Sequence, residues 1–114
     1  MVDCLFCKII NKEINSAILF EDDDVLAFKD INPQAPIHFL IVPKKHISTI
    51  NDLPQEDEKI TGKMILTAQS LAKQENIDEK GYRLVFNCNS DGGQEVYHIH
   101  LHLLGGRQMQ WPPG

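Results

Sequence analysis

The chain has 114 residues, of which 42% are hydrophobic and 24% are charged, a length and composition typical of one globular domain. We therefore expect residues 1–114 to form a single domain. Eleven basic against sixteen acidic residues give a net charge of −5, which argues against a nucleic-acid partner. No stretch approaches the roughly 20 apolar residues of a membrane span, so we expect no membrane partner either.

The first residues carry an early acid and lack the basic start and long apolar run of a secretory signal. The chain contains three cysteines, which cannot all pair with one another. A cytoplasmic protein with reduced thiols is therefore expected.

In chain order, residues 4–12 place apolar side chains at three- and four-residue spacing, which predicts a short helix. Two apolar runs, 19–20 and 25–28, flank the acidic residues 21–24 and predict a hairpin. Residues 38–42 are rich in strand-forming residues and predict a buried strand that stops at Pro43.

One long helix is predicted from about Pro54 to about Asn76, because proline suits a first helical turn and acidic residues follow it. Strands are then predicted over 82–88 and 97–103, with a glycine-containing loop over 89–94 between them. These elements indicate an α+β fold: an antiparallel sheet of about five strands, one long helix and a short N-terminal helix.

Histidine is the unusual residue, because three of the five histidines, His98, His100 and His102, lie within six positions. Alternate residues of a strand share a face and lie about 7 Å apart, so these imidazoles would line one face. Each would oppose protonation of its neighbours, which predicts mostly neutral rings. A neutral imidazole can be a nucleophile, an acid or base, or a metal ligand.

The residues alone leave three interpretations open. The histidines could simply face solvent from a half-buried strand, or all three could bind one metal, although a straight row makes such ligation awkward. The third interpretation uses the preceding loop, since the amides of Gly92 and Gly93 can form a concavity for anionic oxygens. A phosphate beside a neutral histidine indicates phosphoryl or nucleotidyl transfer with an imidazole nucleophile.

The segment 91–107 resembles the signature of the histidine triad superfamily, and the similarity continues through 30–39 and 42–47. The last ten residues resemble the histidine triad nucleotide-binding branch rather than the diadenosine polyphosphate hydrolases. The resemblance implies a homodimer whose sheet extends across both protomers. It also implies a purine nucleoside phosphoramidase that hydrolyses the P–N bond of adenosine 5′-phosphoramidates to AMP and an amine, with no cofactor required for catalysis.

By position, the resemblance makes His100 the nucleophile that forms a nucleotidyl-histidine intermediate. His102 would contact the phosphate and assist proton transfer to the leaving amine, which leaves poorly unless protonated. His38 would support the nucleophile from a neighbouring strand, and His98 would order the site from the near end of the row.

The resemblance also implies a nucleotide site. Asp30 would accept hydrogen bonds from the ribose, although the residues alone favour an ordinary turn acid before Asn32 and Pro33. The base would lie against Phe28 and Ile31. The phosphate would face Asn87 and the backbone of Gly93, Gln94, Glu95 and Val96. Animal members carry serine where this chain has Glu95, and a carboxylate would repel the phosphate unless it were protonated or turned away.

The two-residue spacing of Cys4 and Cys7 is that of half a zinc site. Superfamily members with such a pair complete it with the histidines that correspond to His46 and His98, which implies a structural zinc. In that case His98 is committed to the metal and cannot serve the phosphate. The alternative is two buried thiols packed in a short helix.

Near the C-terminus, Trp111 begins a rigid Trp-Pro-Pro-Gly segment. The resemblance implies that this segment lines the leaving-group pocket of the other protomer, and packing at the dimer edge is the alternative. Three alternatives to the phosphoramidase also stay open: a regulatory protein that binds purine nucleotides without turnover, a dinucleoside polyphosphate hydrolase, and a zinc-stabilised scaffold.

Overall fold

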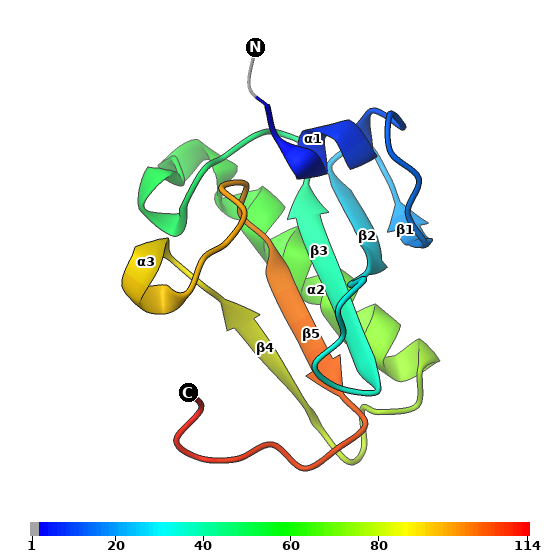
Figure 1. Ribbon diagram of the computed structural model, residues 1–114. Coiled ribbons are helices and arrows are strands. Elements are labelled where there is room, and N and C mark those ends of the chain that lie inside the picture. Colours follow the sequence, from blue (N-terminus) through cyan, green and yellow to red (C-terminus); the bar gives the residue numbers. More distant parts are fainter. Residues whose placement is uncertain (1–2) are drawn as a thin grey trace.

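The computed structural model describes residues 3–114 and contains a five-stranded sheet in the order β1-β2-β3-β5-β4, with every neighbouring pair antiparallel (Figure 1). The strands are β1 (Ile18–Glu21), β2 (Val25–Lys29), β3 (Ile37–Pro43), β4 (Tyr82–Phe86) and β5 (Leu101–Gly105). The helices are α1 (Leu5–Ile10), α2 (Glu58–Gln74) and α3 (Asn89–Gly92), and two short 3-10 turns are Ile50–Asp52 and Gln55–Asp57. This arrangement confirms the predicted α+β class.

The long helix α2 covers one face of the sheet, where it lies behind the strands in Figure 1. Its buried side chains recur at helical spacing, as Met64, Ala68, Leu71 and Ala72. They join inward-facing strand residues such as Ile41 in the main hydrophobic core.

The opposite face is covered at one end by the short helix α1. Phe6 and Ile9 of this helix join Leu26, Phe28 and Leu40 in a second apolar cluster. Because side chains alternate along a strand, the residues of β3 and β5 that point to this face include His38 and His102. The sheet thus separates a hydrophobic core on one side from the histidines on the other.

Three predicted elements differ in extent from the observed ones. The long helix begins at Glu58, because 3-10 turns occupy residues 50–52 and 55–57. The strand 82–88 ends at Phe86, and the loop 89–94 contains the one-turn helix α3.

The prediction that residues 97–100 belong to a strand is wrong, because β5 begins at Leu101. In the β3–β5 register Ile41 pairs with Leu101, so Pro43 would stand opposite Ile99 and has no N–H to continue the ladder. Ile99 donates instead to the carbonyl of Ile47, 2.8 Å away. His98 and His100 are therefore freed from the strict alternation that was expected of them.

Within residues 3–114, no helix combines the length and the apolar character needed to cross a membrane.

Candidate active site

A cavity of about 380 Å³ opens on the histidine-bearing face of the sheet. Its lining residues come from the β2–β3 loop, from β3, from the segment around α3, and from β5 and the residue before it: Asp30, Asn32, Gln34, His38, Asn87, Gly93, Glu95, His100 and His102. The sequence predicted seven of these residues for the site. Two polar residues, Asn32 and Gln34, were not predicted, because their place in the cavity depends on how the β2–β3 loop folds back toward β3.

Hydrogen bonds fix the tautomer of His38. Its Nδ1 accepts from the backbone N–H of Gln34 at 3.0 Å, so the single proton of the neutral ring is at Nε2. That Nε2–H points to His102 Nδ1, 2.9 Å away, and lies 3.4 Å from Asp30 Oδ2. The other oxygen of Asp30 accepts from the N–H of Asn32 at 2.8 Å, which is the turn geometry that the sequence allowed.

The same reasoning fixes the tautomer of His102. Because His102 Nδ1 accepts a hydrogen bond, its own proton is at Nε2. That atom is buried and has no hydrogen-bond partner among the described residues. A buried N–H without a partner is rare in a folded protein, so a ligand oxygen or nitrogen is expected to accept from it.

His100 has the complementary arrangement. Its Nδ1 lies 2.8 Å from the carbonyl oxygen of His98 and must donate to it, which leaves a lone pair on Nε2. The His100 and His102 rings lie 4.9 Å apart, centre to centre. The cavity therefore presents one imidazole with a free lone pair beside another with a free N–H, an arrangement suited to nucleophilic attack and leaving-group stabilisation.

The three rings of the cavity are neutral at physiological pH. Burial, helped by the neighbouring rings of His100 and His38, lowers the pKa of His102 to about 4. Burial also lowers the pKa of His38 and of His100 below the ordinary value of histidine. A neutral His100 keeps the lone pair that a nucleophile requires.

His98 does not line this cavity. Its Nε2 donates to the carbonyl of Pro43 at 2.7 Å, and its Nδ1 faces a cluster formed with Cys4, Cys7 and His46. Nδ1 lies 3.5 Å from Cys4 Sγ, 3.6 Å from Cys7 Sγ and 3.2 Å from His46 Nδ1. The four potential ligand atoms all lie within 4.8 Å of one another.

The Cys/His cluster fits a metal ion. Because the Nε2 of His98 carries its proton, its Nδ1 presents a lone pair to the two sulfurs and to His46 Nδ1. Two thiol sulfurs and two imidazole nitrogens that converge within 4.8 Å are the donor set that zinc prefers. At zinc sites a ligating histidine usually donates its other N–H to a carbonyl or carboxylate, as His98 does to the carbonyl of Pro43.

A second group of ligand-type residues, Asp30, His38 and His102, does not fit a metal ion in the same way. Both nitrogens of His38 are already used, Nδ1 as an acceptor and Nε2 as a donor. A metal on Nε2 would require the ring to lose its only proton. We therefore interpret this group as a hydrogen-bond network.

Several residues predicted for the nucleotide site lie outside the cavity lining. The Gln94 side chain is buried and bonded to the backbone of Asn89, Ser48 and Val96, so it holds the loop. Phe28 and Val96 pack with the second apolar cluster. Ile31 is 96% exposed, and Trp111, which was predicted for the leaving-group pocket, is 83% exposed.

Phe6 supports the site from α1 and was not predicted. Its ring packs edge-on against His100, with centres 5.0 Å apart, and against His98 at 6.0 Å. It also contacts Phe28 at 5.5 Å. The helical spacing of residues 4–12 marks Phe6 as apolar, but it does not indicate which side chains the helix would meet.

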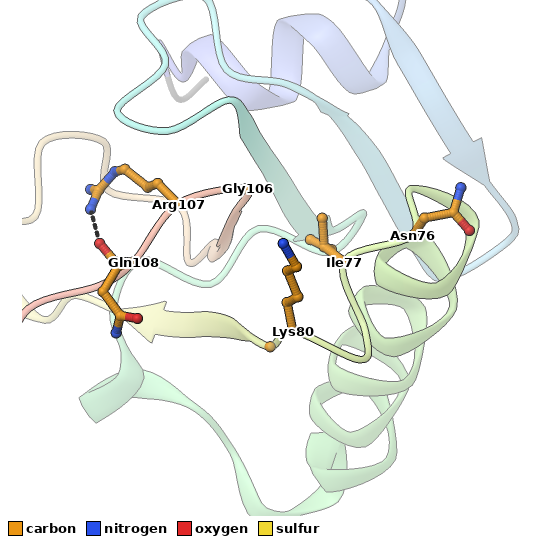
Figure 2. A pocket seen from close by; sticks show the side chains of 7 residues that line it. Asn76, Ile77, Lys80, Gly106, Arg107 and Gln108 are labelled. Atoms are coloured by element: carbon orange, nitrogen blue, oxygen red, sulfur yellow. Dashed lines mark hydrogen bonds between the residues drawn. The ribbon is translucent and has the colours of Figure 1, made fainter.

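A larger cavity, about 510 Å³, lies near the ends of α2 and β5 and is lined by Asn76, Ile77, Lys80, Gly81, Gly106, Arg107 and Gln108. Figure 2 shows the Arg107 guanidinium turned toward the Gln108 carbonyl, to which it donates at 3.2 Å. This lining contains no histidine, cysteine or carboxylate. The groups able to perform acid, base or nucleophilic chemistry gather in the smaller cavity.

Comparison with known proteins agrees with this geometry. The HIT domain model matches residues 11–109, and the chain belongs to the HIT domain family. The purine nucleoside phosphoramidase of Escherichia coli K12 is 55% identical over 107 residues, which cover 94% of this chain and 90% of that protein.

Solved structures agree with the fold. A HIT family hydrolase from Legionella pneumophila is 62% identical, with a TM-score of 0.96, over 98% of this chain and all of the other. A histidine triad protein from Clostridium difficile is 46% identical, with a TM-score of 0.93, over 96% of each chain.

Proposed function

We propose that this protein is a purine nucleoside phosphoramidase, which hydrolyses the P–N bond of adenosine 5′-phosphoramidates to AMP and an amine. The observation that carries the proposal is the pairing of a free Nε2 lone pair on His100 with a free Nε2–H on His102 in one cavity. The E. coli relative supports it by its name and by 55% identity.

In the first step, His100 Nε2 attacks the α-phosphorus and forms an N–P bond. The P–N bond of the substrate breaks, its electron pair moves to the amine nitrogen, and that nitrogen takes the Nε2 proton of His102. The negative charge left on the His102 ring is stabilised by the Nε2–H of His38 and balances the positive charge on the nucleotidyl-imidazole. The His98 carbonyl, 2.8 Å from His100 Nδ1, stabilises the positive charge that develops on the nucleotidyl-imidazole.

In the second step, water attacks the phosphorus of the nucleotidyl-histidine. Its oxygen remains on AMP, its proton returns to His102, and the N–P bond breaks with its electron pair returning to His100 Nε2. His38 keeps His102 oriented throughout by the 2.9 Å hydrogen bond to Nδ1. No cofactor enters either step.

The remaining residues of the cavity support nucleotide binding. Asp30 presents a carboxylate to the ribose hydroxyls from the β2–β3 loop, and Asn87 and Gly93, from the segment around α3, line the same cavity for the phosphate. Exposed Ile31 provides the apolar wall for the base, whereas Phe28, buried in the second apolar cluster, would support the site only from below the surface. Glu95 is exposed, so its carboxylate can turn to solvent while its backbone faces the phosphate.

The test is AMP release from an adenosine 5′-phosphoramidate by wild type and by His100→Ala. We expect the substitution to reduce turnover at least about 10³-fold, because it removes the nucleophile, and to leave AMP affinity within a few fold by calorimetry. AMP binding without turnover in the wild type would contradict the phosphoramidase and favour a regulatory nucleotide-binding protein.

We further propose a structural zinc held by Cys4, Cys7, His46 and His98. When bound, it would supply a cross-link between α1 and the sheet and no catalytic chemistry. With His98 committed to the metal, its contribution to the site is the backbone carbonyl that orients His100. Thiol ligands need a reducing compartment, and the three cysteines are unpaired, which supports a cytoplasmic location.

We also propose that residues 1–114 form a single HIT domain that pairs as a homodimer through β4. This strand is an edge of the sheet, and its Leu84 is partly exposed. The C-terminal segment runs beside β4, where Arg83 donates to the carbonyl of Gln110 at 2.8 Å. Trp111, exposed in one protomer, would then reach the leaving-group pocket of the other.

A further inference from the structure

We propose that the backbone N–H of Gln34 is a positioning group that sets where His102 holds its proton, and so determines which leaving groups the site can expel. The inference rests on the proposed function. It concerns a main-chain donor in the β2–β3 loop, three hydrogen bonds away from the leaving group.

The chain of donors and acceptors runs in one direction. Gln34 N–H donates to His38 Nδ1 at 3.0 Å, and His38 Nε2–H donates to His102 Nδ1 at 2.9 Å. The remaining proton of His102 is then at Nε2, which is buried and without a partner in the described part of the chain. An N–H cannot reverse its role, so Gln34 fixes the direction of the whole chain.

The opposite tautomer of His38, with its proton on Nδ1, is disfavoured at both ring nitrogens. A proton on His38 Nδ1 would face the Gln34 N–H across 3.0 Å, and the bare Nε2 would then allow His102 to carry its proton at Nδ1. His102 Nε2 would lose its N–H and present a lone pair to the leaving nitrogen. Asp30 Oδ2, 3.4 Å from His38 Nε2, favours the same tautomer as Gln34 but leaves Nδ1 unconstrained.

The loop is anchored so that this donor stays in place. Asp30 N–H donates to the carbonyl of His38 at 3.0 Å and closes the loop at its base. The carbonyl of Gln34 accepts from Arg107 Nε at 3.1 Å, just beyond β5. Beside it, Gly106 approaches Pro36 so closely that a Cβ on the glycine would come within 2.9 Å of the proline ring.

The rate of the first step should depend on the proton at His102 Nε2 most strongly for leaving groups that cannot depart without protonation. An alkylamine must be protonated as the P–N bond breaks, whereas a 4-nitrophenolate leaves without a proton. Loss of the Gln34 N–H should therefore slow the first step for the amine and spare the first step for the nitrophenolate.

The experiment compares Gln34→Pro, which removes the N–H, with Gln34→Ala, which keeps it while losing the same side chain. The substrates are an adenosine 5′-phosphoramidate of an alkylamine and the 4-nitrophenyl ester of AMP, each followed in a single turnover. We expect Gln34→Pro to be slower than Gln34→Ala by on the order of 10²-fold with the amine and within about threefold with the ester. Equal losses on both substrates, or no loss on either, would overturn the inference.

Nitrogen-15 NMR of the wild-type histidine rings reads the tautomers directly and needs neither a variant nor turnover. At pH 7 we expect protons on Nε2 of His38 and His102 and bare Nδ1 atoms on both. A His102 proton on Nδ1 would overturn the inference even if Gln34→Pro failed to fold. A wild type that hydrolyses no phosphoramidate would instead defeat the proposed function, and the NMR result would still decide the tautomer.

Discussion

The histidines of the cavity differ in what their Nε2 atoms offer a ligand, because it is a lone pair in His100, an N–H in His102 and already bonded in His38. His100 keeps a lone pair at Nε2 because a backbone carbonyl takes its Nδ1 proton, and His102 keeps an N–H at Nε2 because His38 supplies a donor to Nδ1. The side chains are chemically identical, so their partners alone distinguish the electron-pair donor from the proton donor. A change of partner is therefore expected to affect function as strongly as a change of the ring itself.

Neutral, buried rings make the stability of the protein depend on pH. The folded-state pKa of His102, about 4, lies below its ordinary value of 6.5. Between these values the unfolded chain binds a proton that the folded chain rejects, so stability is lost as the pH falls from about 6.5 to about 4. One titrating histidine changes the free energy of unfolding by at most about 1.4 kcal/mol for each pH unit in this range.

Urea unfolding at several pH values, with a zinc chelator present throughout, checks this dependence. His102→Asn keeps an acceptor for His38 but does not titrate in this range, so its free energy of unfolding should fall less steeply with decreasing pH than that of the wild type. Parallel slopes for the two proteins would show that His102 does not titrate as described.

At the scale of elements, α1 supports both the Cys/His cluster and the cavity. Cys4 caps the helix, its Sγ accepting from the N–H of Cys7, and Phe6 packs edge-on against the ring of His100. Such aromatic contacts contribute about 0.5–1.5 kcal/mol beyond the burial of area. The helix thus packs against His100 while Phe6 itself stays outside the cavity lining.

Phe6→Leu should therefore reduce kcat several-fold, because His100 loses the ring that packs against its face, while KM changes little. Ile9→Val is the matched control, since Ile9 is buried in the same helix and has no aromatic contact with the histidines. Ile9→Val should lower the free energy of unfolding by about 0.5–1.5 kcal/mol and leave kcat unchanged. Equal effects of the two substitutions on kcat would assign Phe6 a purely structural role.

Sequence patterns correctly predicted those elements whose structure depends only on neighbouring residues in the chain. The hairpin, β3 and α2 were predicted because alternation, proline and helical spacing are properties of a short window. The true start of β5 was missed because it depends on Pro43, which lies across the sheet. Asn32, Gln34 and Phe6 were missed for the same reason, since their contacts join segments far apart in the sequence.

At the scale of the molecule, the Cys/His cluster joins three distant parts of the chain. Residues 4 and 7 come from the start of α1, residue 46 from the segment after β3 and residue 98 from the segment before β5. A ligand that binds only the folded state stabilises it by mass action. A zinc ion in this cluster should therefore raise the thermal stability of the whole protein.

Metal analysis after purification without chelators should find one zinc per chain. Cys7→Ser should abolish that content and lower the Tm by roughly 5 °C or more. Cys88→Ser is the control. Because Cys88 lies outside the cluster, this variant should retain the metal. Zinc-free wild type with an unchanged Tm in chelator would contradict the structural site.

The exposed edge of β4 gives a test of assembly. Light scattering should give the wild type a mass of twice 13.0 kDa. Leu84→Lys places a charge on the edge and should shift the mass toward one chain, because charged edges oppose strand pairing. The control is Leu66→Lys, on the exposed side of α2, which should remain a dimer. If Leu84→Lys also remained a dimer, the interface would lie elsewhere.

The contact between Cys4 and His98 spans 94 positions of the sequence. Helix α1 is synthesised before the two rings against which Phe6 packs, those of His98 and His100, whereas its apolar partners on β2 and β3 follow it closely in the chain. Closing so long a loop is slow because its entropy is lost before the contact forms. Helix α1 is therefore expected to dock on β2 and β3 first and to reach His98 and His100 later, so a nascent chain should acquire the geometry of the cavity only after β5 has been released.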